Sequence, residues 1–252
     1  METVDIFGCN VAAINMKETI TEVEKIIENR QLTQHVVINA SKVVLMNENE
    51  EIKKIVQDCP IINADGQSIV WASKFLGRPL PERVAGIDLM DELIKLSSEK
   101  GYSIYFFGAK EEVVLKVIEI YKEKYPNLKV KGYRNGYFKE EDNEAIVEDM
   151  RKSNADILFV AFSSPKKEYW IKENIEKINI PFCMGVGGSF DVVAGVTERA
   201  PKWMQNIGLE WFYRFLQEPK RMWKRYLVGN SKFIYLTIKE KYKKQNYNRR
   251  YL

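Results

Sequence analysis

The chain has 252 residues, of which 45% are hydrophobic, and its 39 Lys and Arg against 35 Asp and Glu give a net charge of +4. This size fits one substantial globular core, and no apolar run reaches the roughly 18 residues of a membrane-spanning helix. Cys9, Cys59 and Cys183 are odd in number and lack paired spacing, which argues against a disulfide or zinc framework and predicts buried, reduced thiols.

Apolar runs of strand length alternate with segments of helical periodicity along most of the chain. The predicted strands are residues 36–39, 61–63, 103–107, 129–133, 157–161 and 182–186. The predicted helices are residues 17–29, 41–58, 68–75, 88–100, 111–125, 140–152 and 166–177. Such alternation indicates an α/β fold, in which a Rossmann-like, largely parallel sheet carries helices on both faces.

The pattern changes after residue 195. Residues 201–244 lose the strand signals and become helical, aromatic and basic, and Pro219 and Gly229-Asn230 divide them into about three predicted helices. We therefore expect two domains, an α/β core of residues 1–195 and a helical C-terminal appendage of residues 196–252.

Four residues that suit ligand contact fall at or just beyond the ends of predicted strands: Asn39, Asp65, Gly108 and Gly187. Ligands of open parallel sheets collect beyond the carboxyl ends of the strands. The sequence therefore predicts a binding site along this edge of the sheet.

Asp65 follows a short apolar run in Asn63-Ala64-Asp65-Gly66, and Arg83 lies in a second turn between Pro81 and Gly86. A carboxylate at one loop end suits proton removal, and an arginine at another suits stabilisation of an anion. The alternative is structural, with Asp65 capping the helix near residue 68 and Arg83 as a solvated loop charge. The residues alone leave both readings open.

A glycine-rich turn, Gly185-Val186-Gly187-Gly188-Ser189, follows the last predicted strand. Backbone without side chains lets a ligand approach closely, and its free amides can cradle phosphate. The turn departs from the dinucleotide fingerprint G-x-G-x-x-G because Phe190 occupies the third glycine position.

Four blocks of the chain, in order, resemble the WecG/TagA/CpsF glycosyltransferase family. They are N-A-D-G-x-x-I-V-x-A-S-K from residue 63, P-L-P-E-R-V-A-G-x-D-L-M from residue 79, P-K-K-E-x-W from residue 165 and G-V-G-G-S-F-D from residue 185. The resemblance runs from about residue 5 to the end. It implies transfer of a sugar from a UDP donor to a lipid-diphosphate-linked sugar at the cytoplasmic membrane face, by inverting single displacement with Asp65 as the base.

The resemblance also implies that Asn39 faces the site, that Asp191 and the glycine turn help to form the nucleotide pocket, and that arginines of the appendage lie near the diphosphate. We assign this last role to Arg214, Arg221 and Arg225. Gly108 is a weaker candidate for substrate contact. Tyr137 fits two roles equally well, stacking on uracil or anchoring its own loop or core.

No metal and no cofactor are expected. The chain has no Asp-x-Asp motif, and its only histidine, His35, sits at the start of a strand, where packing is the expected role. Cationic side chains would then hold the departing diphosphate, with Arg83 as the first candidate, since guanidinium and ammonium groups match phosphate oxygens. Each of these arginines also suits a plain surface charge.

Two positions depart from the family pattern. Some members have Thr where this chain has Val37, and most have Gln where it has Lys167. These changes put the donor and acceptor sugars in doubt more than the reaction type. Two roles fit Lys167 about equally well, binding of the diphosphate and a solvated position on a helix.

The charge of the chain is divided. Residues 199–252 carry 14 Lys and Arg against three Glu, whereas the remaining 198 residues carry 25 against 32. Aromatic residues interleave with these basic ones, which favours an anionic membrane surface as partner of the C-terminal helices. The alternatives are packing on the protein's own core and a dimer interface; nucleic acid is not expected, because the rest of the chain is acidic.

We expect a cytoplasmic protein, because the N-terminal residues lack a signal-peptide pattern and the cysteines lack paired spacing. The basic, aromatic C-terminal helices would hold it peripherally on the inner membrane face. Its expected reaction moves an N-acetylhexosamine, N-acetylmannosamine first, from UDP to undecaprenyl-diphosphate-linked N-acetylglucosamine. Wall teichoic acid and another surface polysaccharide are both open as the pathway, as is a homo-oligomer. The alternatives are a nucleotide-cofactor enzyme on a Rossmann-like sheet and a noncatalytic membrane-binding module.

Overall fold

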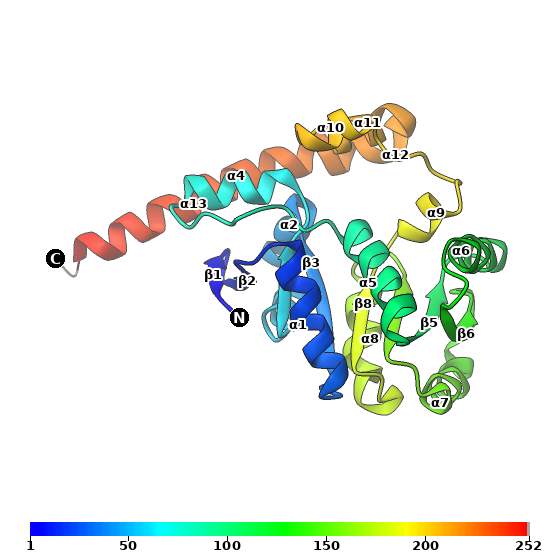
Figure 1. The fold of residues 1–252 in the computed structure, drawn as a ribbon. Coiled ribbons are helices and arrows are strands. Elements are labelled where there is room, and N and C mark those ends of the chain that lie inside the picture. Colours follow the sequence, from blue (N-terminus) through cyan, green and yellow to red (C-terminus); the bar gives the residue numbers. More distant parts are fainter. Residues whose placement is uncertain (251–252) are drawn as a thin grey trace.

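The computed structural model describes the backbone of residues 1–250, with all side chains in that range except those of residues 206, 221, 222, 224, 225 and 244–250. At its centre lies a parallel sheet in the order β4-β3-β8-β7-β5-β6 (Figure 1). Its strands are β3 (Thr33–Ile38), β4 (Ile61–Ala64), β5 (Ser103–Gly108), β6 (Lys129–Arg134), β7 (Ile157–Ala161) and β8 (Phe182–Gly185). These are the six strands predicted from the sequence.

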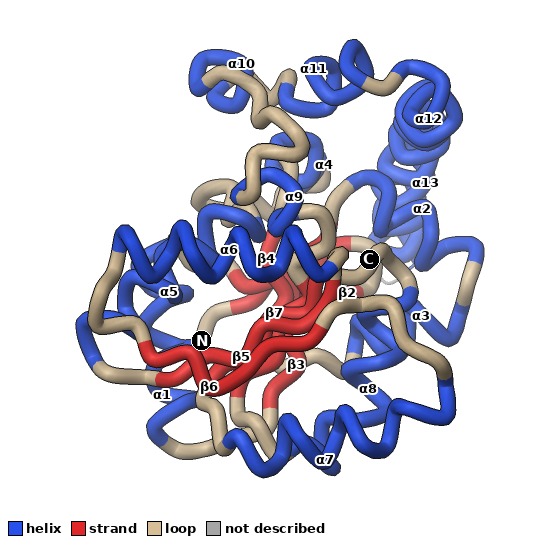
Figure 2. The backbone as a smooth tube through the Cα atoms, turned by 90° about the vertical axis from the view of Figure 1, so that its right-hand side faces the viewer, coloured by secondary structure: helices blue, strands red, loops and turns tan. Residues whose placement is uncertain are grey.

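Helices cover both faces of the sheet, as predicted (Figure 2). One face is covered by α1 (Met16–Glu28), α5 (Gly86–Lys100), α6 (Glu111–Lys124) and α9 (Ser189–Val193). The other is covered by α2 (Ala40–Glu48), α3 (Glu50–Gln57), α4 (Gln67–Phe75), α7 (Asn143–Ser153) and α8 (Lys166–Ile178), with a 3₁₀ turn, η1 (Glu140–Asp142), before α7.

Strand β5 explains the double covering. Ile104 and Phe106 point into the core under α5 and α6, while Tyr105 and Phe107 point into the core under α7 and α8. Successive side chains of a strand alternate between faces, so an uninterrupted apolar run is a strand that is buried on both sides.

Two local features differ from the sequence-based expectation. The predicted helix 41–58 is two helices, because Asn49 adopts an extended conformation, ends α2 and caps α3 by accepting a hydrogen bond from the Ile52 amide at 3.0 Å. An antiparallel hairpin of β1 (Thr3–Ile6) and β2 (Cys9–Ala12) precedes the sheet and was not predicted. The three cysteines are unpaired and buried, as predicted.

The C-terminal helices are α10 (Lys202–Asn206), α11 (Glu210–Gln217), α12 (Pro219–Trp223), a π-helical segment η2 (Lys224–Val228) and α13 (Gly229–Arg250). The last three form one continuous helical stretch, so the predicted break at Gly229-Asn230 is wrong. A glycine inside a helix costs only about 1 kcal/mol, which packing readily offsets.

Helix α13 supplies that packing, because it lies along α2 (Figure 1). Phe233 is buried in the core cluster beneath α2, and its ring centroid is 5.6 Å from that of Phe7 in the hairpin. On the rest of its surface α13 exposes Ile234, Tyr235, Ile238 and Tyr242. The helix therefore packs on the protein's own core and also presents apolar side chains to the outside. Within the part of the chain that was described, no helix has both the length and the apolar character of a membrane span.

Candidate active site

The carboxyl ends of β3, β4 and β8 form the part of the sheet edge where the candidate residues gather. The chain leaves β3 into α2 on one face of the sheet and leaves its neighbour β8 into α9 on the other face. Where neighbouring strands lead to opposite faces, their loops part and leave a crevice for a ligand. Asn39 follows β3, Asp65 follows β4 and Gly187 follows β8, so the sheet brings these three predicted site residues to this edge.

Asp65 is not a helix cap. The N-cap of α4 is Gly66, whose φ of 143° is a conformation that favours glycine, and no side chain caps this helix. The Asp65 amide donates to the Ile38 carbonyl at 2.8 Å, which ties the end of β4 to β3. Its half-buried carboxylate makes no hydrogen bond or ion pair with any described residue. The structural alternative for this residue is therefore wrong.

Burial raises the pKa of Asp65 above its usual value, and the nearby Glu210 carboxylate raises it further. Three cations act in the opposite direction: Arg83, Lys167 and Arg214. A carboxylate with a raised pKa binds a proton more tightly and is a stronger base. The structure thus brings together four residues of the predicted site, because Arg83, Lys167 and Arg214 all act electrostatically on Asp65.

Arg83 is largely buried, so it is not the solvated loop charge of the alternative reading. Its guanidinium lies 3.1 Å from Glu210 Oε2 and 3.8 Å from Asp88 Oδ2. Glu210 belongs to α11, so this ion pair links the core to the C-terminal helices.

Arg199 completes the same charge network. It binds both carboxylate oxygens of Asp88, at 2.6 and 2.9 Å, and its Nε lies 3.6 Å from Glu210 Oε1. Burial alone would raise the pKa of Asp88, but the hydrogen bonds and charge of Arg199 outweigh it and lower that pKa. Two arginines and two carboxylates therefore fix α11 above the carboxyl edge of the sheet.

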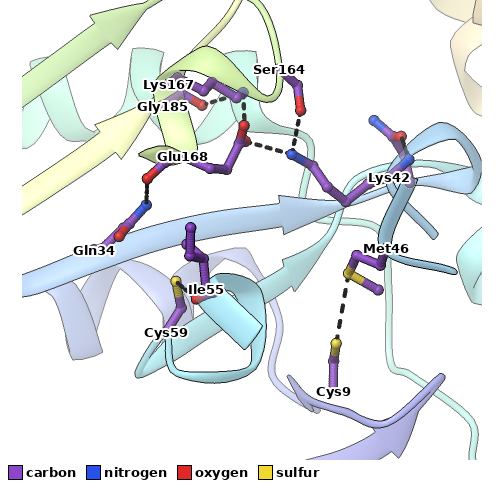
Figure 3. Close-up of polar contacts among 11 residues, drawn as sticks. Cys9, Gln34, Lys42, Met46, Ile55, Cys59, Ser164, Lys167, Glu168 and Gly185 are labelled. Atoms are coloured by element: carbon purple, nitrogen blue, oxygen red, sulfur yellow. Dashed lines mark hydrogen bonds and ion pairs between the residues drawn. The ribbon is translucent and has the colours of Figure 1, made fainter. Parts of the chain in front are cut away.

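The glycine turn after β8 is packed against Lys167 (Figure 3). A Cβ on Gly185 would lie 2.7 Å from Lys167 Cδ, so only glycine leaves room for this stem. Lys167 Nζ donates to the Gly185 carbonyl at 2.9 Å and would lie 3.6 Å from a Cβ on Gly187. Lys167 is mostly buried at the site, which makes the solvated position wrong.

A buried ion pair stands beside Lys167. Lys42 Nζ lies 2.5 Å from Glu168 Oε1 and 2.6 Å from Ser164 Oγ, and the Lys42 and Glu168 side chains are 5% and 2% exposed. Lys167 Nζ is 3.9 Å from the same Glu168 oxygen. Lys42 and Lys167 thus both approach the one Glu168 carboxylate next to the glycine turn.

Asn39 and Asp191 are two further residues of the predicted site. Asn39 caps α2, accepting from the Lys42 amide at 3.0 Å, and its Cβ is 3.5 Å from where a Cβ on Gly66 would lie. A capping role therefore accounts for Asn39 without a ligand. Asp191, in α9, directs Oδ2 toward Gly188, 3.8 Å from the position of an added Cβ.

Arg214 makes no ion pair with the side chains that are described, so its guanidinium remains available to an anion. Arg221 and Arg225, the other two predicted arginines of the appendage, have side chains outside the described set.

Gly108 and Tyr137 lie toward the opposite end of the sheet edge. Strands are spaced about 4.8 Å apart, so β5 and β6, which precede them, lie roughly 19 and 24 Å from β4. Close packing explains Gly108, because a Cβ there would lie 2.8 Å from the Ala161 backbone. Tyr137 is 71% exposed, so a core role is wrong, and its amide anchors the loop by donating to Asn135 Oδ1 at 2.9 Å.

His35 is a packing residue, as predicted. It is buried, its Nε2 is 2.8 Å from Asn63 Oδ1, and burial lowers its pKa to about 4. Among the residues that the structure describes, no group of three or more His, Cys, Asp or Glu could hold a metal ion.

Sequence reasoning missed Lys42, Glu168, Arg199 and Glu210 as site residues. Glu168 stood within the P-K-K-E-x-W block, which was a signal without an assigned role. The other three are ordinary charged residues on helices or loops, and only the fold brings them to the site.

Comparison with known proteins gives consistent matches. Residues 4–247 match the model of the glycosyl transferase WecG/TagA/CpsF family. The chain is 33% identical over 193 residues to an N-acetylglucosaminyldiphosphoundecaprenol N-acetyl-beta-D-mannosaminyltransferase of Bacillus subtilis, which covers 77% of this chain and 74% of the relative. It is 34% identical over 192 residues to the protein of the same description from Bacillus spizizenii, covering 76% and 73%.

Proposed function

Because the chain belongs to the WecG/TagA/CpsF family of glycosyl transferases, we propose that it moves N-acetylmannosamine from UDP to the N-acetylglucosamine of an undecaprenyl-diphosphate carrier. The observation that carries the proposal is the Asp65 carboxylate, half-buried at the carboxyl edge of the sheet, raised in pKa and surrounded by Arg83, Lys167 and Arg214. Membership of this family argues against a nucleotide-cofactor enzyme and a noncatalytic module.

In the proposed reaction an acceptor hydroxyl attacks the anomeric carbon of the donor sugar. The new carbon–oxygen bond forms as the bond to UDP breaks, which inverts the configuration in one displacement. Asp65 takes the hydroxyl proton, a role that calls for a carboxylate within hydrogen-bond reach and without a competing partner.

The negative charge that develops on UDP is met by cationic side chains. Arg83 and Arg214 act on Asp65 electrostatically and therefore lie near the reacting centre, and Lys167 holds the glycine turn. We place the diphosphate at this turn, the sugar toward β4 and the uridine toward Gly108 and Tyr137. The donor would then extend along the strand ends, which accommodates the separation of the predicted residues. No metal takes part in this scheme.

The acceptor is a lipid, and the surface next to the site suits a membrane. Exposed large apolar side chains occur on α4, α10, α11 and α13, including Trp71, Phe75, Trp203 and Leu216. Lys241 of α13 donates to the Phe75 carbonyl at 2.7 Å, so α4 and α13 are neighbours. Aromatic and basic residues together favour the headgroup region of an anionic bilayer. We propose a peripheral location on the inner membrane face, in cell-wall or surface-polysaccharide synthesis.

The test is release of UDP from UDP-N-acetylmannosamine and from UDP-N-acetylglucosamine, with a short-chain lipid-diphosphate-N-acetylglucosamine acceptor, in the presence and absence of EDTA. We expect turnover with the first donor, no effect of EDTA and loss of turnover in Asp65→Asn. Turnover with neither donor would refute the proposed reaction, and loss of turnover with EDTA would refute the metal-free scheme.

A further inference from the structure

The buried cluster of Lys42, Glu168 and Lys167 has two ammonium groups for one carboxylate (Figure 3). Lys42 takes the close contact with Glu168 Oε1, at 2.5 Å, whereas Lys167 Nζ stands 3.9 Å from that oxygen and binds the Gly185 carbonyl instead. The second carboxylate oxygen, Glu168 Oε2, is buried and has no hydrogen-bond partner.

Glu168 is fixed from two sides. Its carbonyl accepts from Gln34 Nε2 of β3 at 3.1 Å, and its carboxylate is held by Lys42 of α2. Lys42 also donates to Ser164 Oγ at 2.6 Å, in the loop that leads into α8. Lys42 thus holds the start of α2 against the loop that leads into α8, the helix that carries Lys167.

A buried carboxylate is strongly stabilised by a nearby cation, because burying an unpaired charge costs far more free energy than burying a paired one. Burial lowers the pKa of Lys42, and the Glu168 carboxylate opposes this shift. If Lys42 were absent, Lys167 would be the nearest cation to Glu168, and the free Glu168 Oε2 would accept its ammonium group. Lys167 would then leave the Gly185 carbonyl and the glycine turn.

We propose that Lys42 is a positioning residue, which satisfies Glu168 and thereby keeps the Lys167 ammonium group at the glycine turn, where it faces the diphosphate of the donor. This inference rests on the proposed function, since Lys42 acts on the same site indirectly, through Glu168 and Lys167. Lys42 itself touches no substrate in this scheme.

The experiment measures UDP affinity by titration calorimetry, and kcat and the donor KM by UDP release, on the full chain. In Lys42→Met, recapture of Lys167 by Glu168 is expected to weaken UDP binding by about tenfold or more, the factor for one charge-assisted hydrogen bond. In the double variant Lys42→Met/Glu168→Gln, no buried carboxylate competes for Lys167. Affinity is then expected to return to within about threefold of the wild type.

A third background separates positioning from a general structural role. With Lys167→Met already present, adding the Lys42→Met/Glu168→Gln pair should change UDP affinity by less than about twofold, because no ammonium group is left to position. Lys172→Met, an exposed lysine on the same helix, is the matched control and should bind UDP as the wild type does.

Wild-type affinity in Lys42→Met would overturn the inference, as would a double variant as weak as the single one or a large further loss in the Lys167→Met background. An unfolded Lys42→Met protein would overturn it too, because recapture by Lys167 predicts a folded one. If the wild-type protein binds neither UDP nor a UDP-sugar, the proposed function fails and this inference falls with it. Failure of Lys42→Met alone to weaken binding leaves the proposed function standing.

Discussion

Replacing Asp65 by Asn is expected to make the protein less active and more stable at the same time. Asn has the same shape and retains the backbone bond to the Ile38 carbonyl. The carboxylate has no hydrogen bond among the described residues that the substitution would break. What is removed is a negative charge in a place where burial and Glu210 both disfavour it.

The size of the gain follows from linkage. Each unit by which the folded state raises the pKa of Asp65 destabilises the folded protein by about 1.4 kcal/mol once the group is ionised. For a chain of this length, 1 kcal/mol corresponds to about 2–4 °C in Tm. Because the folded pKa lies above the unfolded one, the gain from Asn is complete above the folded pKa. It disappears as the pH falls toward the unfolded value of about 3.9.

The assay is thermal unfolding of the wild type and of Asp65→Asn between pH 4 and 8, together with UDP release at neutral pH. Turnover should fall by about 10²–10⁴, the usual contribution of a general base. Glu176→Gln, which removes one negative charge from an exposed position on α8, is the control and should leave both quantities unchanged. A lower Tm for Asp65→Asn at neutral pH would refute the electrostatic reasoning, and an undiminished turnover would refute the base.

Three further predictions concern the C-terminal helices and α4. Glu210→Gln should lower the pKa of Asp65 and move the acid limb of the pH–kcat profile to lower pH, whereas an unmoved limb would contradict the coupling. Arg214→Gln removes a cation that lowers the pKa of Asp65, so it should move the acid limb to higher pH. It should also lower kcat/KM for the donor by about tenfold, the value of one charge-assisted contact. A shift of the limb to lower pH would contradict this prediction. Trp71→Ser should lower the affinity for phosphatidylglycerol vesicles, measured by co-sedimentation, by about tenfold. Leu115→Ser, which removes an exposed apolar side chain of α6, is the control. Equal binding of the two variants would exclude α4 from the membrane surface.

The sheet was predictable from the sequence because its inner strands, such as β5 and β7, are buried on both faces. A run such as Ile104-Tyr105-Phe106-Phe107 has no solvent side, and its flanking helical segments leave only a parallel arrangement. The hairpin before the sheet was missed because its strands have only four residues each, too short for a clear alternating pattern, although Ile6, Cys9, Val11 and Ala12 are buried. The continuous helix through Gly229 was missed because tertiary packing overrode a local signal.

The candidate site was predictable where a residue stands at a strand end, and not where its partner comes from a distant part of the chain. Asp65 follows β4 directly and Gly187 lies two residues beyond the end of β8, so the order of strands was enough to place them. The partners of Arg83 were not accessible in this way. Its contact with Glu210 spans 127 positions in sequence, and nothing in the local pattern around residue 210 distinguishes that glutamate from a solvated one.

Under the proposed function, the arrangement of charges would give the C-terminal helices a part in the chemistry as well as in membrane contact. Of the four charged side chains that act on Asp65, Glu210 and Arg214 belong to α11, and they act in opposite directions. The basicity of Asp65 therefore depends on how α11 sits over the sheet, which the ion pairs of Glu210 with Arg83 and Arg199 fix. Since the same helix exposes Trp211, Phe212 and Leu216, a bilayer that binds these side chains would act on the segment that sets the pKa of the base. In the proposed scheme, contact with the membrane and the basicity of the Asp65 carboxylate would then both depend on how α11 packs over the sheet.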